Sequence, residues 1–256
     1  MSEQYPTGLR WRALQLAKRG NTADEIEDAL HASATLGRFA VADGVTDSIF
    51  SSTWARLLVQ KFVAEPPPES LPWNDWLQGP RADWQQEIRQ QPLPWYAEHK
   101  LSTGAAATLI GLQIHSDGAW NAIAVGDACL FHFRNQELLT AFPIQQSTMF
   151  DNRPAVLRSN PQDEDMLVER RLGTWRAGDT FALATDALAQ WILAEHERNA
   201  AVWNGIDQLI STADDLPRIE HEINLLRDSR RLRNDDVALL VVDLTDRCGS
   251  VPLESC

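Results

Sequence analysis

The sequence predicts an α+β fold built mostly from antiparallel sheet. Its strand-like segments cluster in hairpins and its helical segments lie between the clusters, whereas a parallel α/β sheet would alternate strand and helix. No glycine-rich phosphate loop precedes a helix, which disfavours the nucleotide-binding folds. No internal repeat and no clear linker divides the 256 residues, so we expect a single domain over residues 1–256.

The first part of the chain predicts three strands and then two helices. Apolar and alternating segments place the strands at residues 11–18, 26–31 and 38–43. Residues 51–63 have apolar side chains at helical spacing, and three consecutive prolines end that helix. A second helix is expected over residues 75–90. The tryptophan-rich segment around it holds Trp73, Trp76, Trp84 and Trp95, which either pack this helical layer onto the core or form an exposed partner surface.

The rest of the chain predicts a meander, an excursion, and then a strand, three helices and a last strand. Hairpin turns place the meander strands at residues 107–114, 120–125, 128–133 and 138–142. Residues 144–170 are polar and are expected to form an irregular surface excursion. The remaining elements are expected at residues 180–185 (strand), 187–195, 201–212 and 216–227 (helices) and 237–244 (buried strand).

Charge and composition exclude several classes of protein. The chain has 23 Lys and Arg against 36 Asp and Glu, a formal net charge of −13, which argues against a nucleic-acid partner. The longest apolar run, residues 237–242, is far shorter than the roughly 20 residues of a membrane-spanning helix. The first residues do not have the pattern of a secretory signal, and the three cysteines include no Cys-x-x-Cys pair. We therefore expect a cytoplasmic protein without a membrane contact.

Five carboxylates flank strands whose interiors are apolar. They are Glu27, Asp43, Asp127, Asp186 and Asp235. Each alone fits a turn, a helix cap or a solvated strand end, but together they place negative charge close to the core. Such charges are costly unless they are paired or bound to a metal. Since basic, His and Cys neighbours are scarce in these motifs, the oxygen-only pattern favours a hard cation such as Mg²⁺ or Mn²⁺.

The motifs that carry these carboxylates resemble the protein phosphatase 2C family of metal-dependent serine/threonine phosphatases. Five motifs stand in the family's order and approximate spacing: residues 27–29 (EDA), 39–44 (FAVADG), 125–127 (VGD), 181–186 (FALATD) and 235–242 (DDVALLVV). The resemblance extends from about residue 12 to residue 244. It implies a four-layer α-β-β-α sandwich. Departures from the family pattern indicate a divergent, bacterial-type member of that family.

The resemblance also implies a site for two Mn²⁺ or Mg²⁺ ions, with a third, weaker ion in some members. Asp43 would bridge the two ions, Gly44 would bind one through its carbonyl, and Asp186 with Asp235 would bind the other. Glu27 would ligate directly or through water, and Asp127 would help to hold a third ion. A basic residue before the Glu-Asp motif grips the substrate phosphate in the family, and here the candidates are Lys18 and Arg19.

The implied activity is hydrolysis of phosphoserine and phosphothreonine in proteins by a metal-bridged hydroxide, without a protein nucleophile. The chain has no Cys-x5-Arg loop and no Gly-x-Ser-x-Gly elbow, which agrees with that mechanism. The implied partners are a phosphoprotein substrate and a cognate Ser/Thr kinase system. Residues 144–172 stand where the family has a variable flap, and the acidic residues 163–165 would either favour basic phosphopeptides or form a solvated loop.

Three departures from the family pattern leave an alternative open. Ala187 stands where Gly is favoured, which would strain a left-handed backbone, Asp236 stands where Asn is common, and residues 105–106 are both Ala. Together with the tryptophan-rich segment, they motivate a weak or inactive module that binds a phosphoprotein or a partner kinase. A structural Ca²⁺ domain is disfavoured because the twelve-residue loop spacing is absent.

Overall fold

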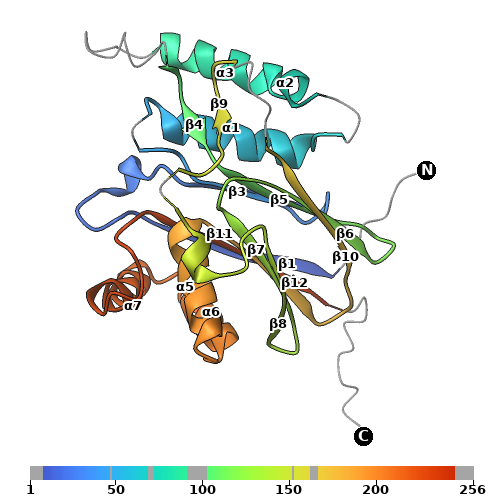
Figure 1. Cartoon of the computed structure of the whole chain (residues 1–256), viewed down its shortest axis with the longest axis vertical. Helices are drawn as coiled ribbons and strands as arrows, with labels where there is room; N and C mark the ends of the chain where they lie inside the picture. Colours follow the sequence, from blue (N-terminus) through green and yellow to red (C-terminus); the bar gives the residue numbers. More distant parts are fainter. Residues whose placement is uncertain are drawn as a thin grey trace, which may run out of the picture.

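Two antiparallel sheets packed face to face form the centre of the computed structural model, and helices cover both outer faces (Figure 1). The structure describes residues 8–46, 48–68, 72–90, 103–151, 153–161 and 167–245. The four-layer α-β-β-α arrangement predicted from the sequence is confirmed.

The first sheet contains the first and the last strand of the described chain as neighbours. Its order is β1 (Leu9–Leu16), β12 (Val237–Leu244), β11 (Asp179–Ala184), β7 (Cys129–Arg134) and β8 (Glu137–Phe142). All neighbouring pairs are antiparallel, and β12 pairs with β1 on one side and β11 on the other. The apolar run of β12 is buried because both of its edges and both of its faces are covered.

The second sheet is built around the central meander. Its order is β10 (Glu169–Thr174), β6 (Ala119–Val125), β5 (Leu109–Ile114), β3 (Arg38–Ala42) and β2 (Ala29–Ser33). A short pair, β4 (Ala106–Ala107) with β9 (Leu157–Arg158), lies beside it. Side chains alternate along β3: Phe39 and Val41 face the other sheet, while Ala40 and Ala42 face the helices.

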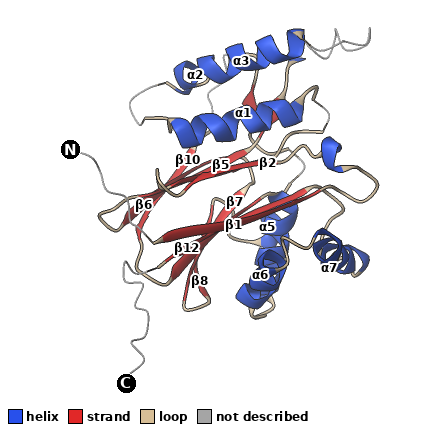
Figure 2. Cartoon of the chain, turned by 180° about the vertical axis from the view of Figure 1, so that it is seen from behind, coloured by secondary structure: helices blue, strands red, loops and turns tan. Residues whose placement is uncertain are grey.

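Helices close the two outer layers, as the view from behind shows (Figure 2). The second sheet is covered by α1 (Ser51–Ala64), α2 (Trp73–Trp76) and α3 (Gln78–Arg89), and the first sheet is accompanied by α5 (Asp186–Glu197), α6 (Val202–Ser211) and α7 (Leu216–Asp228). Two 3₁₀ turns, η1 (Ala23–Glu25) and η2 (Ser147–Met149), complete the described elements. None of the described helices has the length and apolar character that a membrane span requires.

The helix expected over residues 75–90 is two helices in the structure. Pro80 has no N–H to donate to the carbonyl of Trp76, so the first helix stops there and a new one begins at Gln78. Trp76 and Trp84 are buried, and their indole N–H groups donate to the carbonyls of Glu65 and Phe50. The packing interpretation therefore holds for these two rings, while Trp95 lies outside the described residues.

The prediction of an irregular excursion is wrong at its C-terminal end. Residues Glu169–Thr174 form β10, the edge strand of the second sheet, and its one partner among the described strands is β6. Because this strand is largely exposed, it has no apolar pattern that would reveal it. The strand expected over residues 26–31 begins only at Ala29, and the acidic stretch at residues 163–165 lies outside the described residues.

A candidate metal centre

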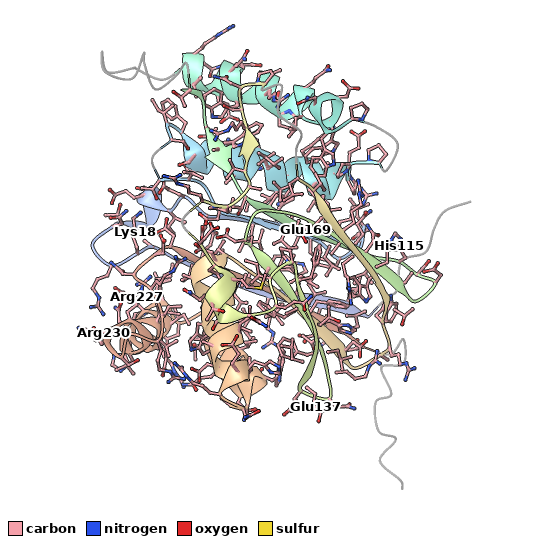
Figure 3. All side chains as sticks on the ribbon, viewed as in Figure 1. Lys18, His115, Glu137, Glu169, Arg227 and Arg230 are labelled. Carbon is pink, nitrogen blue, oxygen red and sulfur yellow. The ribbon has the colours of Figure 1, made fainter. Side chains whose placement is uncertain are left out.

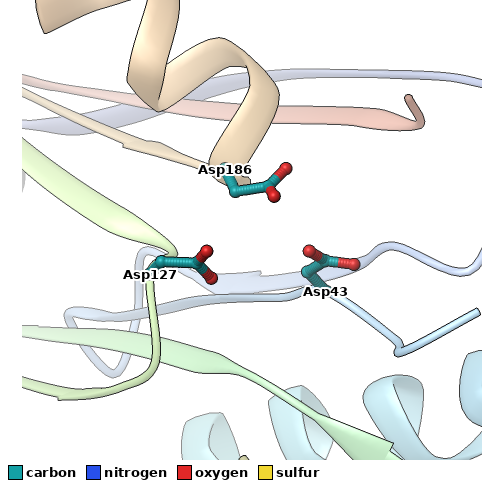
Figure 4. A group of neighbouring side chains, drawn as sticks. All are labelled: Asp43, Asp127 and Asp186. Carbon is teal, nitrogen blue, oxygen red and sulfur yellow. The ribbon is translucent and has the colours of Figure 1, made fainter. Parts of the chain in front are cut away.

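Three aspartates from separate strand ends converge at one end of the two sheets (Figure 4). Asp43 directly follows β3, Asp127 lies between β6 and β7, and Asp186 begins α5 directly after Thr185 at the end of β11. One carboxylate oxygen from each residue lies within 4.8 Å of the others. A single small ligand could therefore contact all three.

Two glycines next to these aspartates allow the backbone to come this close. Gly126 has a φ of +95°, and a Cβ there would lie 2.6 Å from the carbonyl oxygen of Ala155. A Cβ on Gly44 would lie 2.7 Å from the carbonyl oxygen of Glu27. A side chain at either position would push the neighbouring segment and its carboxylate out of place.

The clustered charge changes the acidity of the group. Burial and the charges of Asp28 and Asp186 raise the pKa of Asp43 well above its usual range. Burial and the Asp186 charge raise the pKa of Asp127 to about 7, and the same two causes raise the pKa of Asp235. Such shifts indicate a site at which negative charge outweighs positive charge.

The donors at this site fit a divalent cation. Oδ1 of Asp127 is buried and has no hydrogen-bond partner in the described part of the chain. All three converging groups offer carboxylate oxygens, which are the ligands that Mg²⁺ and Mn²⁺ prefer. A cation would pair with the unpartnered oxygen and balance the like charges.

Asp235 lies beside the three converging aspartates but is not one of the residues whose carboxylate oxygens lie within 4.8 Å of one another. It precedes β12, and its charge contributes to the raised pKa of Asp43. Its carbonyl oxygen accepts a hydrogen bond of 2.6 Å from Nη2 of Arg227. The backbone of Asp235 is thereby held by α7, and its side chain belongs to the same electrostatic cluster.

Glu27 lies close to the site but points elsewhere. Its two carboxylate oxygens accept hydrogen bonds of 2.6 Å from the hydroxyls of Thr46 and Ser51. Nζ of Lys18 lies 3.6 Å from the same carboxylate. The structure therefore places Glu27 at the start of α1 and does not bring it into the group of three aspartates.

The two basic candidates for phosphate contact differ in their surroundings. Lys18 (labelled in Figure 3) contacts Glu27 and Thr46 near the site. Arg19 uses all three of its guanidinium nitrogens on α7, where Asn224 and Asp228 accept its hydrogen bonds. The structure brings Lys18 toward the carboxylates and holds Arg19 away from them.

Sequence reasoning missed two residues of the site. Asp28 is buried, accepts a hydrogen bond of 2.8 Å from the Thr185 hydroxyl, and also hydrogen-bonds the Asp43 carboxyl. Burial is the main cause that raises its pKa. Side chains of neighbouring extended residues point to opposite sides. If Glu27 points away from the three aspartates, its neighbour Asp28 is therefore the acidic residue of this motif that points toward them.

The second missed residue is Arg233, in the loop between α7 and β12. Its Nη2 donates to Oδ2 of Asp186, which is 47 positions away in the sequence. No motif spacing connects the two residues, so only the fold reveals this contact. Ala187 lies inside α5 and not in a left-handed conformation, so the strain expected there does not arise.

The segment of the expected flap borders the site. Ala155 lies against Gly126, and β9 pairs with β4. A cavity of about 390 Å³ lies between the segment of residues 153–158 and the loop that begins at Val45, directly after Gly44 in the sequence.

Comparisons with known proteins agree with this geometry. The sequence matches the family model of protein phosphatase 2C over residues 22–222. Solved structures with the same fold include the Mycobacterium tuberculosis serine/threonine phosphatase PstP/Ppp (16% identity, TM-score 0.60), PppA from Pseudomonas aeruginosa (19%, 0.59) and the PstP catalytic domain with two manganese ions (18%, 0.56). Each match covers 93% of this chain and 99% of the other. No curated protein sequence matches the chain significantly.

Proposed function

Because the chain belongs to the protein phosphatase 2C family, we propose that it hydrolyses phosphoserine and phosphothreonine in proteins with the help of bound divalent cations. The observation that carries the proposal is the convergence of Asp43, Asp127 and Asp186, with one buried oxygen of Asp127 unpartnered. A phosphatase site must concentrate positive charge near a phosphoryl group, and an acidic pocket does so by holding cations.

Residues of five motifs would hold the cations. Asp43 would be the bridge between two ions, as the family resemblance implies, while Asp186, Asp235 and Asp127 would supply further oxygens. The Gly44 carbonyl and, through an intervening water, Glu27 would complete the set. Bound cations at this position would stabilise negative charge on the phosphoryl oxygens and activate a water molecule. Mn²⁺ and Mg²⁺ both suit these ligands, and structurally similar proteins were solved with manganese and with magnesium.

Two other residues, Lys18 and Cys129, differ in what they can contribute to the reaction. Lys18 lies near the carboxylates, with its Nζ 3.6 Å from Glu27, and would contribute positive charge toward the substrate phosphate. Cys129 is buried, and burial raises the pKa of its thiol, so it does not serve as a nucleophile. The substrate is a phosphorylated protein, in a cytoplasmic system that pairs this phosphatase with a Ser/Thr kinase.

The test is an assay of metal-dependent hydrolysis. Release of phosphate from Ser/Thr phosphopeptides should require Mn²⁺ or Mg²⁺ and stop on addition of EDTA. Asp43→Asn and Asp235→Asn should lower the rate by roughly a hundredfold or more, because each removes a charged ligand. Asp214→Asn, at an exposed position in the turn that follows α6, is the matched control and should keep full activity.

Two results would contradict the proposal. One is full activity of both ligand variants, and the other is hydrolysis that is insensitive to EDTA. A wild-type protein that binds no divalent cation but binds a phosphoprotein tightly would identify the chain as a non-enzymatic module of the same fold.

A further inference from the structure

One guanidinium lies among the carboxylates of the candidate metal centre. Arg233 donates from Nη2 to Oδ2 of Asp186, and its charge also interacts with Asp235 and Asp127. The side chain is 39% exposed, so it reaches from the cluster toward solvent. Among the described residues, Arg233 is the one arginine whose side chain forms an ion pair with a candidate metal ligand.

Arg233 has unused donor capacity. Its Nε is buried and has no hydrogen-bond partner among the described residues. A guanidinium has five N–H donors, and planar paired contacts to a phosphoryl group use two of them at once. The contact with Asp186 through Nη2 therefore leaves donors for an anion at the same place.

Three other basic residues in neighbouring segments are already engaged. The three guanidinium nitrogens of Arg19 are bound to α7, and Lys18 pairs with Glu27. Arg231, two residues from Arg233 in the same loop, pairs with Glu195 on α5. Arg233 differs from these residues because its partner is a carboxylate that a cation would claim.

We propose that Arg233 binds the phosphoryl group of the substrate, and that its contact with Asp186 is the resting position of this phosphate-binding residue. This inference rests on the proposed function, because it assigns the anion contact of the same site. A cation held by Asp186 would neutralise that carboxylate and weaken its attraction for Arg233. The guanidinium of Arg233 would then be free to contact phosphoryl oxygens at the neighbouring position.

The inference predicts opposite effects of Arg233→Gln on two ligands. Removing the guanidinium should weaken the binding of inorganic phosphate to the Mn²⁺-loaded protein about tenfold to a hundredfold, the range for a charge-assisted hydrogen bond. Binding of Mn²⁺ to the metal-free protein should stay as tight or become tighter, because a competing positive charge is gone. A misfolded variant would instead bind both phosphate and Mn²⁺ more weakly.

Isothermal titration calorimetry of each ligand provides the test, with wild-type protein, Arg233→Gln, Arg233→Lys and Arg231→Gln. Arg231→Gln is the matched control: it removes an ion-paired arginine of the same loop and should leave phosphate binding unchanged. Arg233→Lys should retain part of the phosphate affinity, because it keeps the charge but loses the planar pair of donors.

The outcomes separate this inference from the proposed function. Equal phosphate affinity in wild type and Arg233→Gln would overturn the inference, and so would a joint loss of Mn²⁺ and phosphate binding, which would assign Arg233 a structural role only. Phosphate binding that depends on Arg233 in a protein that hydrolyses no phosphopeptide would support the inference while the proposed function fails. A wild-type protein that binds neither ligand would overturn both.

Discussion

Oδ2 of Asp236 accepts a hydrogen bond of 2.8 Å from the backbone N–H of Glu27, although the two residues are 209 positions apart. Oδ1 of the same carboxylate accepts one of 2.7 Å from the N–H of Lys18. One buried side chain next to β12 therefore fixes both ends of the loop that carries the Glu-Asp motif. Asp236 replaces the Asn that is common in the family, and both of its oxygens are used.

Asp236→Asn should destabilise the protein even though Asn is nearly isosteric. An amide offers one acceptor oxygen, and its NH₂ group would face one of the two backbone N–H donors. A buried donor left unsatisfied costs about 1–3 kcal/mol, and a chain of this size loses roughly 2–4 °C of Tm per kcal/mol. Thermal unfolding should show a Tm drop of several degrees. Exposed Asp214→Asn is the control, and an unchanged Tm in Asp236→Asn would contradict this role.

The metal-free protein should lose stability as pH rises from about 4 to about 7. The folded-state pKa of Asp127 is about 7, above its ordinary value of 3.8, because burial and the charge of Asp186 oppose ionisation. The folded state therefore retains a proton that the unfolded chain releases, and stability falls as pH rises between these values. Tm measured in EDTA should be lower at pH 8 than at pH 5.5.

Two matched measurements check this pH dependence. Asp127→Asn, which cannot ionise, should show a flatter pH profile in EDTA, and Mn²⁺ should remove most of the slope in the wild type. A wild-type Tm in EDTA that rises between pH 5.5 and pH 8 would show that other groups dominate.

Asp43→Asn should stabilise the metal-free protein while abolishing the stabilisation that Mn²⁺ provides. The carboxylate of Asp43 is buried and its pKa is raised by burial and by neighbouring acids, so removing its charge relieves repulsion. The same change removes the central ligand. Tm with EDTA should rise and the Tm increase on adding Mn²⁺ should vanish. A variant that is less stable in EDTA and still responds to Mn²⁺ would contradict the assignment.

Arg227→Lys should weaken metal binding from outside the cluster. Arg227 (Figure 3) donates from Nη2 to the carbonyls of Asp235 and Ala17, and this contact holds the start of β12 against the end of β1. Nη1 of Arg227 also donates to Asn224, and a lysine has only one nitrogen for all of these acceptors. Asp235 therefore loses part of its support, and Mn²⁺ affinity should fall about tenfold or more. Arg230→Lys, in the turn that follows α7, is the control. Equal Mn²⁺ affinity in both variants would argue against a positioning role.

Sequence reasoning succeeded where burial leaves a clear pattern and failed where it does not. The run of β12 and the apolar stripe of α1 are buried, so hydrophobicity revealed them. The exposed edge strand β10 has polar residues on nearly every position, and its pairing with β6 supplies the order that composition does not. The break before α3 depends on Pro80, a single missing N–H that a count of apolar residues does not detect.

The residues of the candidate site also divide into those that a burial pattern in the sequence predicts and those that it does not. Asp43, Asp127 and Asp186 could be predicted because each ends an apolar strand, and strand ends meet at one edge of the fold. The orientation of Glu27 depends on two hydroxyls and a lysine, and the position of Arg233 depends on a loop whose path no periodic pattern encodes. Residue types at strand ends were readable, whereas contacts between distant loops required the three-dimensional structure.

The central position of β12 determines when this molecule can become functional. Its neighbours β1 and β11 are joined only through β12, so a nascent chain that has not yet released residues 237–244 from the ribosome has an open gap in the middle of one sheet. Such long-range pairing is slow and leaves strand edges exposed meanwhile. Asp235 and Asp236 directly precede that strand, so the acidic centre is complete only after residues 237–244 have paired. A chain in which β12 has not yet paired therefore lacks part of the candidate metal centre.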